Sequence, residues 1–214
     1  MNRSQHVRAC WLGSTPYREA WDLQADLVRA LREGGGDNTL LLLEHPHVFT
    51  MGRVAAAEHV LWDDAERSDK AVDLIWSDRG GEATYHGPGQ LVVYPLVDLR
   101  RAQLGVRDLV TALETSVIDL AAGFAVSAQS RRSAPGVYVA GKKLASIGIR
   151  VRRGASYHGL ALNVALDLEP FRRINPCGYP GLEMTQLSAL GGPATVAEAA
   201  AALQPLLLGA LGLI

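Results

Sequence analysis

The sequence has very few cysteines and almost no net charge. Its two cysteines, Cys10 and Cys177, form no C-x-x-C pair, which excludes a disulfide framework and fits a reducing compartment. A formal net charge of −1 among 214 residues gives no electrostatic basis for binding nucleic acid or an anionic membrane surface. The N-terminus lacks the apolar core of a signal peptide, and polar residues and a proline interrupt the apolar residues 196–214. We therefore expect a cytoplasmic protein without a membrane-spanning segment.

Clusters of metal-ligating residues are also scarce. His45 and His47 are spaced to share one face of a strand, but no third ligand lies nearby, so we expect no metal site. Apolar residues, by contrast, make up 48% of the chain and charged residues 20%, which is typical of a globular protein with a substantial core. This composition and the length predict one domain, residues 1–214.

Helical and extended patterns interleave irregularly along the chain. Apolar residues recur at helical spacing over residues 17–31 and 106–124, and a capping box at Thr195–Glu198 predicts a final helix that Pro205 would kink or end. Strands are predicted at residues 39–43, 73–76, 91–94, 137–139, 144–151 and 160–164, and loops at 44–52 and 170–181. These patterns favour an α/β (α+β) domain with a mixed β-sheet over a doubly wound fold.

The segment from Arg79 to Pro95, RGGEATYHGPGQLVVYP, combines four glycines with a tyrosine and a histidine ahead of an apolar strand. Glycine lets the backbone adopt positive φ and approach a ligand without a Cβ in the way. A strand directly after the glycines would hold such a loop rigidly. We interpret the segment as a ligand-binding loop.

Cys177 and Lys143 are the candidate reactive residues. Cys177 lies between Pro176 and Gly178, in a segment too irregular for a core, and loops on a rigid scaffold commonly carry nucleophiles. A nucleophilic cysteine must be a thiolate, so a neighbouring cation has to lower its pKa from about 8.5. From the residues alone, His86, His158 and the pair Lys142–Lys143 are the possible partners, and a Cys–His pair is the default.

The position of Lys143 leaves two interpretations open. If residues 143–147 form a regular strand, Lys143 shares a face with Ala145 and Ile147. It would then be either an edge lysine that extends its ammonium into water or a deliberately buried charge.

Four segments in a fixed order resemble the lipoyl/octanoyl transferase family. They are RGGEATYHGPGQLVVYP, GKKLASIGIRV, YHGLALN and INPCGYPG, and the stretch from Glu44 to Arg53 is similar as well. The resemblance covers residues 40–187. Enzymes of this family move an octanoyl group from acyl carrier protein to a lysine of lipoyl domains.

The resemblance implies a fold, a mechanism and a set of site residues. The fold would be that of lipoate and biotin protein ligase catalytic domains, a mixed β-sheet flanked by helices, here as one acyltransferase domain over residues 1–214. Cys177 would form an acyl-thioester, and Lys143 would lower its pKa, although motif alignment alone selects Lys143 over Lys142. The acyl substrate would contact Arg79, Gly80, Gly81, Glu82, Ala83, Thr84, Tyr85, His86, Ser146, Ile147, Gly148, Gly159, Leu160 and Ala161.

The implied partners are octanoyl-acyl carrier protein as donor and, as acceptors, the lipoyl domains of 2-oxoacid dehydrogenase complexes and the glycine cleavage H protein. Because a thioester is already activated, no cofactor, ATP or metal would be needed. We expect the small residues to leave a slot for the acyl chain, with Ile147 and Leu160 as its walls. The alternatives are an ATP-dependent lipoate or biotin ligase of the same fold, a non-catalytic acyl-carrier or lipoyl-domain binding module, and a Cys–His hydrolase.

Overall fold

The computed structural model describes residues 7–174 and 182–213. Its helices are α1 (Tyr17–Arg32), α2 (Asp64–Asp69), α3 (Val106–Ala122) and α4 (Val196–Ala210), with 3-10 turns at Ala57–His59, Glu169–Arg173 and Ser188–Leu190. Its strands are β1 (Val7–Ser14), β2 (Asn38–Glu44), β3 (Val48–Met51), β4 (Asp73–Trp76), β5 (Ala83–His86), β6 (Gln90–Leu96), β7 (Gln129–Ser130), β8 (Gly136–Val139), β9 (Lys142–Arg152) and β10 (Ala155–Asn163).

The strands form two sheets. The larger has seven strands in the order β1-β2-β6-β10-β9-β8-β7, and only its β1–β2 pair is parallel. The smaller has the order β4-β3-β5, with β3 parallel to β4 and antiparallel to β5. The predicted mixed sheet with flanking helices is confirmed.

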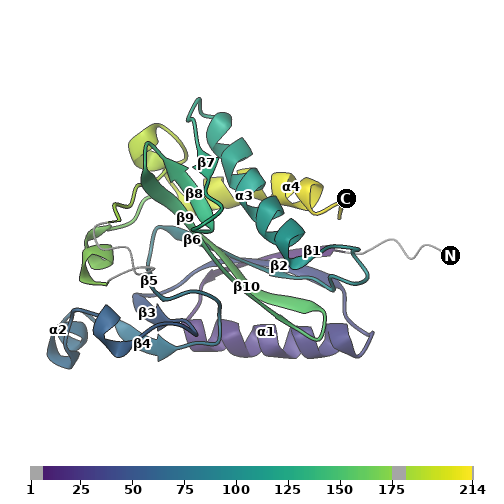
Figure 1. Cartoon of the computed structure of the whole chain (residues 1–214), viewed down its shortest axis with the longest axis horizontal. Coiled ribbons are helices and arrows are strands. Elements are labelled where there is room, and N and C mark those ends of the chain that lie inside the picture. The colour runs from purple at the N-terminus through teal and green to yellow at the C-terminus, as the bar shows by residue number, and fades with distance from the viewer. Residues whose placement is uncertain (1–6, 175–181, 214) are drawn as a thin grey trace.

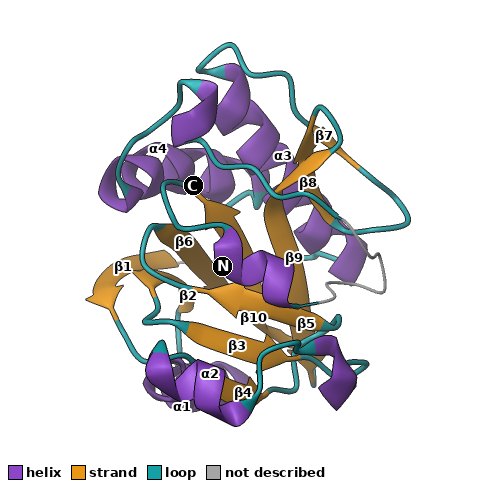
Figure 2. Ribbon diagram, turned by 90° about the vertical axis from the view of Figure 1, so that its left-hand side faces the viewer, coloured by secondary structure: helices purple, strands orange, loops and turns teal. Residues whose placement is uncertain are grey.

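Helices cover both faces of the large sheet, α3 and α4 on one side and α1 on the other (Figures 1 and 2). Alternation along the strands produces the two apolar faces. On β6, Leu91 and Val93 join the core beneath α3 and α4, whereas Val92 and Tyr94 pack toward α1. Aromatic and aliphatic side chains of the small sheet form a third core.

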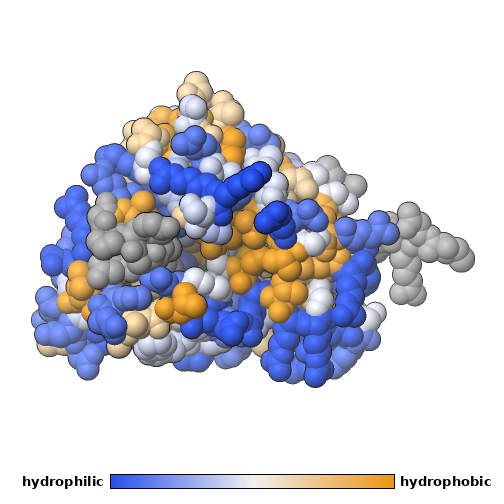
Figure 3. All heavy atoms as spheres, in the orientation of Figure 1, coloured by the Kyte–Doolittle hydropathy of each residue, from blue (hydrophilic) through white to orange (hydrophobic). Residues whose placement is uncertain are grey.

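Helix α1 is amphipathic, as its spacing predicts, and it ends before Gly34, whose φ of +80° suits a residue without a side chain. Its solvent side contributes to the hydrophilic lower edge of the molecule in Figure 3. Among the described residues, no helix is long and apolar enough to cross a bilayer.

Two details of the sequence-based prediction are wrong. The expected loop at residues 44–52 contains β3, and the glycine-rich segment contains β5. Of the two effects predicted for Pro205, it does not end the helix, because α4 continues through it. Proline inside a helix costs about 3 kcal/mol, but Ala199 and Leu203 before it and Leu207 after it are buried, so packing of this face outweighs the loss.

Candidate active site

A cavity of about 470 Å³ lies beside the large sheet, and residues 79–84, Tyr17 of α1, Val110 of α3 and residues 133–135 contribute to its lining. Lys143 lines it, together with every residue that the resemblance assigns to the acyl site except Tyr85: Arg79, Gly80, Gly81, Glu82, Ala83, Thr84, His86, Ser146, Ile147, Gly148, Gly159, Leu160 and Ala161. Tyr85 is buried in the core of the small sheet instead, where its hydroxyl lies 2.5 Å from Nδ1 of His47. Cys177 lies outside the described residues.

The sheet surface under the cavity carries only small side chains. Ser146 pairs with Ala161, and Gly148 pairs with Gly159, so these four residues share a face. A Cβ on Gly148 would lie 2.9 Å from the carbonyl oxygen of Gly80. The Gly80 amide in turn donates to the Ile149 carbonyl at 3.2 Å. The glycine therefore allows the loop of residues 79–82 to lie directly on β9.

Ile147 and Leu160 border the cavity, but they alternate with these small residues. Both pack with the core beneath α3 and α4. Alternation points their side chains toward the opposite face of the sheet, where Val110 of α3 also lines the cavity, and their role as walls of the slot stays a prediction.

Lys143 also lies on a different face from the one that a regular strand predicts. Tyr138 pairs with Lys143, but its neighbour Val137 pairs with Ala145, so β9 holds one extra residue, a β-bulge at Leu144. Since Val137 and Tyr138 point to opposite faces, Lys143 and Ala145 do so as well. The bulge places Lys143 on the face of Ser146, not on that of Ala145 and Ile147.

The surroundings of Lys143 fit a buried ammonium. Its side chain is 3% exposed, with Nζ 5.6 Å from the centre of the Tyr138 ring. A Cβ on Gly136 would lie 2.8 Å from Cε of Lys143, so this glycine makes room for the lysine stem. Lys142, in contrast, is 53% exposed and forms an ion pair with Glu183 at 2.7 Å. Of the two lysines, only Lys143 lines the cavity.

Backbone hydrogen bonds attach residues 183–185 to Lys143. The Lys143 amide donates to the Glu183 carbonyl at 2.8 Å, and the Thr185 amide donates to the Lys143 carbonyl at 2.9 Å. On the other side of residues 175–181, the Leu61 amide donates to the Arg173 carbonyl at 2.8 Å. The chain that precedes Met184 is therefore joined to β9 at the lysine itself.

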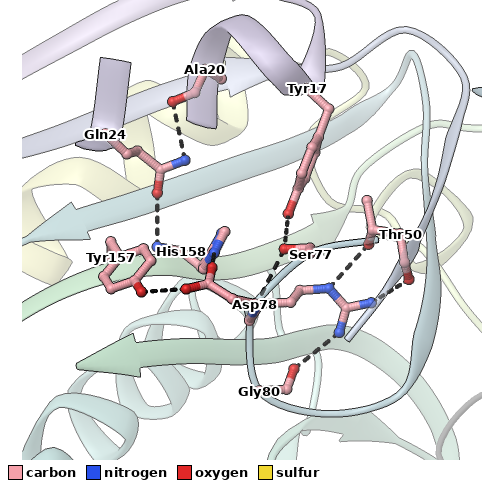
Figure 4. A network of polar contacts seen from close by, with 10 residues as sticks. Tyr17, Ala20, Gln24, Thr50, Ser77, Asp78, Gly80, Tyr157 and His158 are labelled. Carbon is pink, nitrogen blue, oxygen red and sulfur yellow. Dashed lines mark hydrogen bonds and ion pairs between the residues drawn. The ribbon is translucent and has the colours of Figure 1, made fainter. Parts of the chain in front are cut away.

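Three side chains tie the loop of residues 77–82 to the rest of the molecule (Figure 4). Ser77 Oγ lies 2.9 Å from the hydroxyl of Tyr17 on α1. The Asp78 carboxylate accepts from the Tyr157 hydroxyl at 2.5 Å and from Nε2 of His158 at 2.9 Å. The buried Arg79 guanidinium donates to Thr50 on β3 and to two loop carbonyls. The glycines beside the cavity thus belong to a rigidly anchored loop.

His158 has an unusual backbone conformation, with φ at +55°. This region costs a residue other than glycine on the order of 1 kcal/mol. The conformation accompanies a ring that lies against Tyr17 and Trp21 of α1, at centroid distances of 6.5 and 5.8 Å. The side chain lines the cavity and is 1% exposed.

The buried histidines are neutral, and their partners define the tautomers. Nδ1 of His45 donates to the Thr15 carbonyl at 2.6 Å, and Nε2 accepts from the Tyr94 hydroxyl at 2.7 Å. Nδ1 of His86 is paired with the Gln90 side-chain oxygen at 2.7 Å, and its Nε2 with the Thr50 hydroxyl at 3.3 Å. Burial lowers the pKa of His45 to about 4 and that of His86 well below its ordinary value.

His158 and Asp78 form a neutral imidazole–carboxylate pair. The hydrogen bond from His158 lowers the pKa of Asp78 to about 2. Burial lowers the pKa of His158, despite the opposing effect of Asp78. Asp78 therefore carries its charge at neutral pH, and His158 does not.

We predict that the protein loses stability between pH 7 and pH 5. An unfolded chain binds a proton at His45 below pH 6.5, whereas the folded protein resists it until about pH 4, so acidification favours unfolding in this window. This residue alone accounts for on the order of 2 kcal/mol at pH 5, and His86 and His158 act in the same direction. Urea unfolding at both pH values measures the loss, which should shrink in His45→Gln. Equal stability at pH 7 and pH 5 would contradict the prediction.

Several cavity residues were not predicted from the sequence. Tyr17 was assigned only to a helix face, and Tyr94 only to a strand, yet both line the cavity. His158 was considered only as a partner of the thiol, although its place beside Gly159 was a usable signal. Within residues 7–174 and 182–213, no group of three His, Cys, Asp or Glu side chains is arranged to hold a metal ion.

Comparison with known proteins identifies the family. Residues 16–206 match the lipoyl protein ligase A/B catalytic domain. An octanoyltransferase from Alkalilimnicola ehrlichii is 53% identical over 189 residues, which cover 87% of this chain and 84% of that protein. An octanoyltransferase from Shewanella frigidimarina is 50% identical over 194 residues, which cover 91% and 86%.

A solved structure has the same fold at low sequence identity. The putative lipoate protein ligase from T. acidophilum with bound lipoic acid superposes with a TM-score of 0.74 at 18% identity, covering 97% of this chain and 86% of that one. The match over residues 16–206, the two relatives and this fold lead to one conclusion: the chain belongs to the lipoyl protein ligase A/B catalytic domain family.

Proposed function

We propose that this protein, as one acyltransferase domain, transfers an octanoyl group from octanoyl-acyl carrier protein to a lysine of lipoyl domains. The acceptors are the lipoyl domains of 2-oxoacid dehydrogenase complexes and the glycine cleavage H protein. The observation that carries the proposal is a buried lysine on the same sheet face as a row of small residues that lines a cavity. Two relatives that are half identical over most of the chain and are named octanoyltransferase support it.

The first half of the reaction forms an acyl-enzyme. The Cys177 thiolate attacks the carbonyl carbon of the donor thioester, the bond to the carrier's sulfur breaks, and that thiolate takes up a proton. The Lys143 ammonium stabilises the Cys177 thiolate and is the source of the proton. A cation in a buried site stabilises an anion far more than one in water, and Lys143 is 3% exposed.

The second half transfers the acyl group to nitrogen. The acceptor lysine attacks the acyl-enzyme as a neutral amine, an amide bond forms, and Cys177 leaves as the thiolate. The amine's proton passes to neutral Lys143, which restores the starting state. His86 is a poorer proton carrier, because each of its ring nitrogens is hydrogen-bonded to the protein, one to Gln90 and the other to Thr50.

Chain connectivity is compatible with contact between Cys177 and Lys143. Met184 forms a β-bridge with Lys143, and Cys177 precedes it by seven residues. Seven residues span at most about 25 Å. The Lys143 side chain itself covers part of the distance between its backbone and Cys177. The anchoring of residues 183–185 therefore permits contact between the two side chains.

Intact-mass spectrometry after incubation with octanoyl-acyl carrier protein tests the nucleophile. We expect the wild-type protein to gain the mass of one octanoyl group and Cys177→Ser to gain none. Cys10→Ser is the matched control, because Cys10 lies on β1 outside the cavity, and it should acylate like the wild type. An adduct that persists in Cys177→Ser would show that another residue is the nucleophile.

The same reagents separate the proposal from its alternatives. Transfer to a lipoyl domain without ATP excludes a lipoate or biotin ligase, which must form an adenylate. Release of free octanoate with no acylated domain would indicate a hydrolase. Tight binding of the donor without release of the carrier would indicate a binding module.

A further inference from the structure

The cavity has two chemically different ends. At one end lies Lys143, beside Met184. At the other lie the rings of Tyr17, Tyr94 and His158, which border the cavity on the α1 side. Lys143 is five residues from Gly148, the partner of Gly159, so the two ends are about 15 Å apart along β9. Tyr94 is on β6, a further two strands, or about 10 Å, across the sheet.

The polar atoms of the rings at this end of the cavity are either hydrogen-bonded to the protein or sealed from solvent. The Tyr17 hydroxyl is bound to Ser77, the Tyr94 hydroxyl to His45, and Nε2 of His158 to Asp78. The remaining nitrogen of His158, Nδ1, is sealed from solvent. A ligand therefore meets aromatic faces, which suit a hydrocarbon.

Tyr17 closes this end as a rigid wall. Its ring stacks on His86 at 5.9 Å and on His158 at 6.5 Å, and it contacts Trp21 edge-on. It is the first residue of α1 and is 4% exposed, so the helix stands behind it. A ring fixed by contacts on several sides and by a hydrogen bond cannot swing aside without breaking them.

We propose that Tyr17 sets the longest acyl chain that the enzyme accepts. This inference rests on the proposed function. The acyl carbonyl lies at Lys143, the chain runs over the small residues of β9 and β10, and its terminal methyl group meets the Tyr17 ring. A medium-length saturated acyl chain fits this path, and each further methylene has to displace the ring.

Acyl-length competition tests the proposal. The kcat/KM for decanoyl- and dodecanoyl-acyl carrier protein is divided by that for the octanoyl donor, in wild type, Tyr17→Ala and Tyr17→Phe. We expect the ratios to rise about tenfold or more in Tyr17→Ala, since one methylene in a hydrophobic pocket changes specificity by that order. Tyr17→Phe keeps the ring and removes only the bond to Ser77, so its ratios should stay near those of the wild type.

The ratios do not depend on the fraction of active protein, so partial unfolding does not affect them. Tyr17→Leu, a smaller change in a buried position, carries the same expectation if the alanine variant does not fold. Unchanged ratios in both shortened variants would overturn the proposal, as would equal rises in Tyr17→Phe and Tyr17→Ala. A wild-type protein that transfers no acyl group of any length would contradict the proposed function itself.

Discussion

Lys143→Ala slows acylation by octanoyl-acyl carrier protein by about 10²- to 10⁴-fold. Without the buried ammonium, the Cys177 thiol returns to an ordinary pKa, and little thiolate is present at neutral pH. The loss should therefore be partly recovered as the pH rises toward 9. Alkylation of Cys177 by iodoacetamide across the same pH range measures the thiolate directly.

Lys142→Ala is the matched control for this experiment. Lys142 is the adjacent residue, but its ammonium is in solvent and paired with Glu183. Exposed ion pairs contribute little to stability. We therefore expect Lys142→Ala to show rates of acylation and alkylation close to those of the wild type. If Lys143→Ala alkylates at the wild-type rate at every pH, Lys143 does not control the thiol. If Lys142→Ala shows the larger defect, the roles of the two lysines are reversed.

Arg79→Leu should destabilise the protein by about 3 kcal/mol or more. The guanidinium is buried, and it donates to the Thr50 hydroxyl at 3.0 Å and to the carbonyls of Thr50, Gly80 and Glu82. Its removal leaves several buried acceptors without these donors, and each unsatisfied group costs about 1–3 kcal/mol. Urea unfolding gives the free energy, and loss of acyl transfer should accompany it because the glycines of this loop line the cavity.

Arg53→Leu provides the comparison, because the Arg53 amide donates to the Arg79 carbonyl while the Arg53 side chain is exposed. Substitutions at exposed positions usually change the free energy of unfolding by no more than about 0.5 kcal/mol. If Arg79→Leu lowers the free energy of unfolding by less than about 1 kcal/mol, water or the loop itself satisfies the acceptors that Arg79 binds in the wild type.

Periodicity predicted the longer elements of the fold well. The spacing of apolar residues located α1 and α3, and the continuous apolar runs located β2 and β6. Strand β3 was missed because four buried residues between a histidine and a glycine show no alternation. Strand β1 was missed because it is an edge strand with a mixed burial pattern that no simple period describes.

The site was predictable in its residue types but not in its geometry. The sequence motifs located Gly148, Gly159 and Lys143, and the structure places all three beside one cavity. The bulge that turns Lys143 onto that face depends on how β8 and β9 pair, which a single strand does not encode. The rings around Tyr17 come from α1, β5, β10 and His45 after β2, and such long-range contacts leave no local pattern.

The bulge at Leu144 makes the position of Lys143 a matter of how β8 and β9 pair. If Leu144 took the place of Lys143 opposite Tyr138, the pairing would be regular, and Lys143 would face the apolar core beneath α3 and α4. Replacing Leu144 by another apolar side chain would leave this pairing and the position of the lysine unchanged. Deleting Leu144 would join Lys143 directly to Ala145, and alternation would still keep the lysine on the face of Ser146. A slip of one residue between β8 and β9, rather than a substitution, would therefore remove the lysine from the cavity.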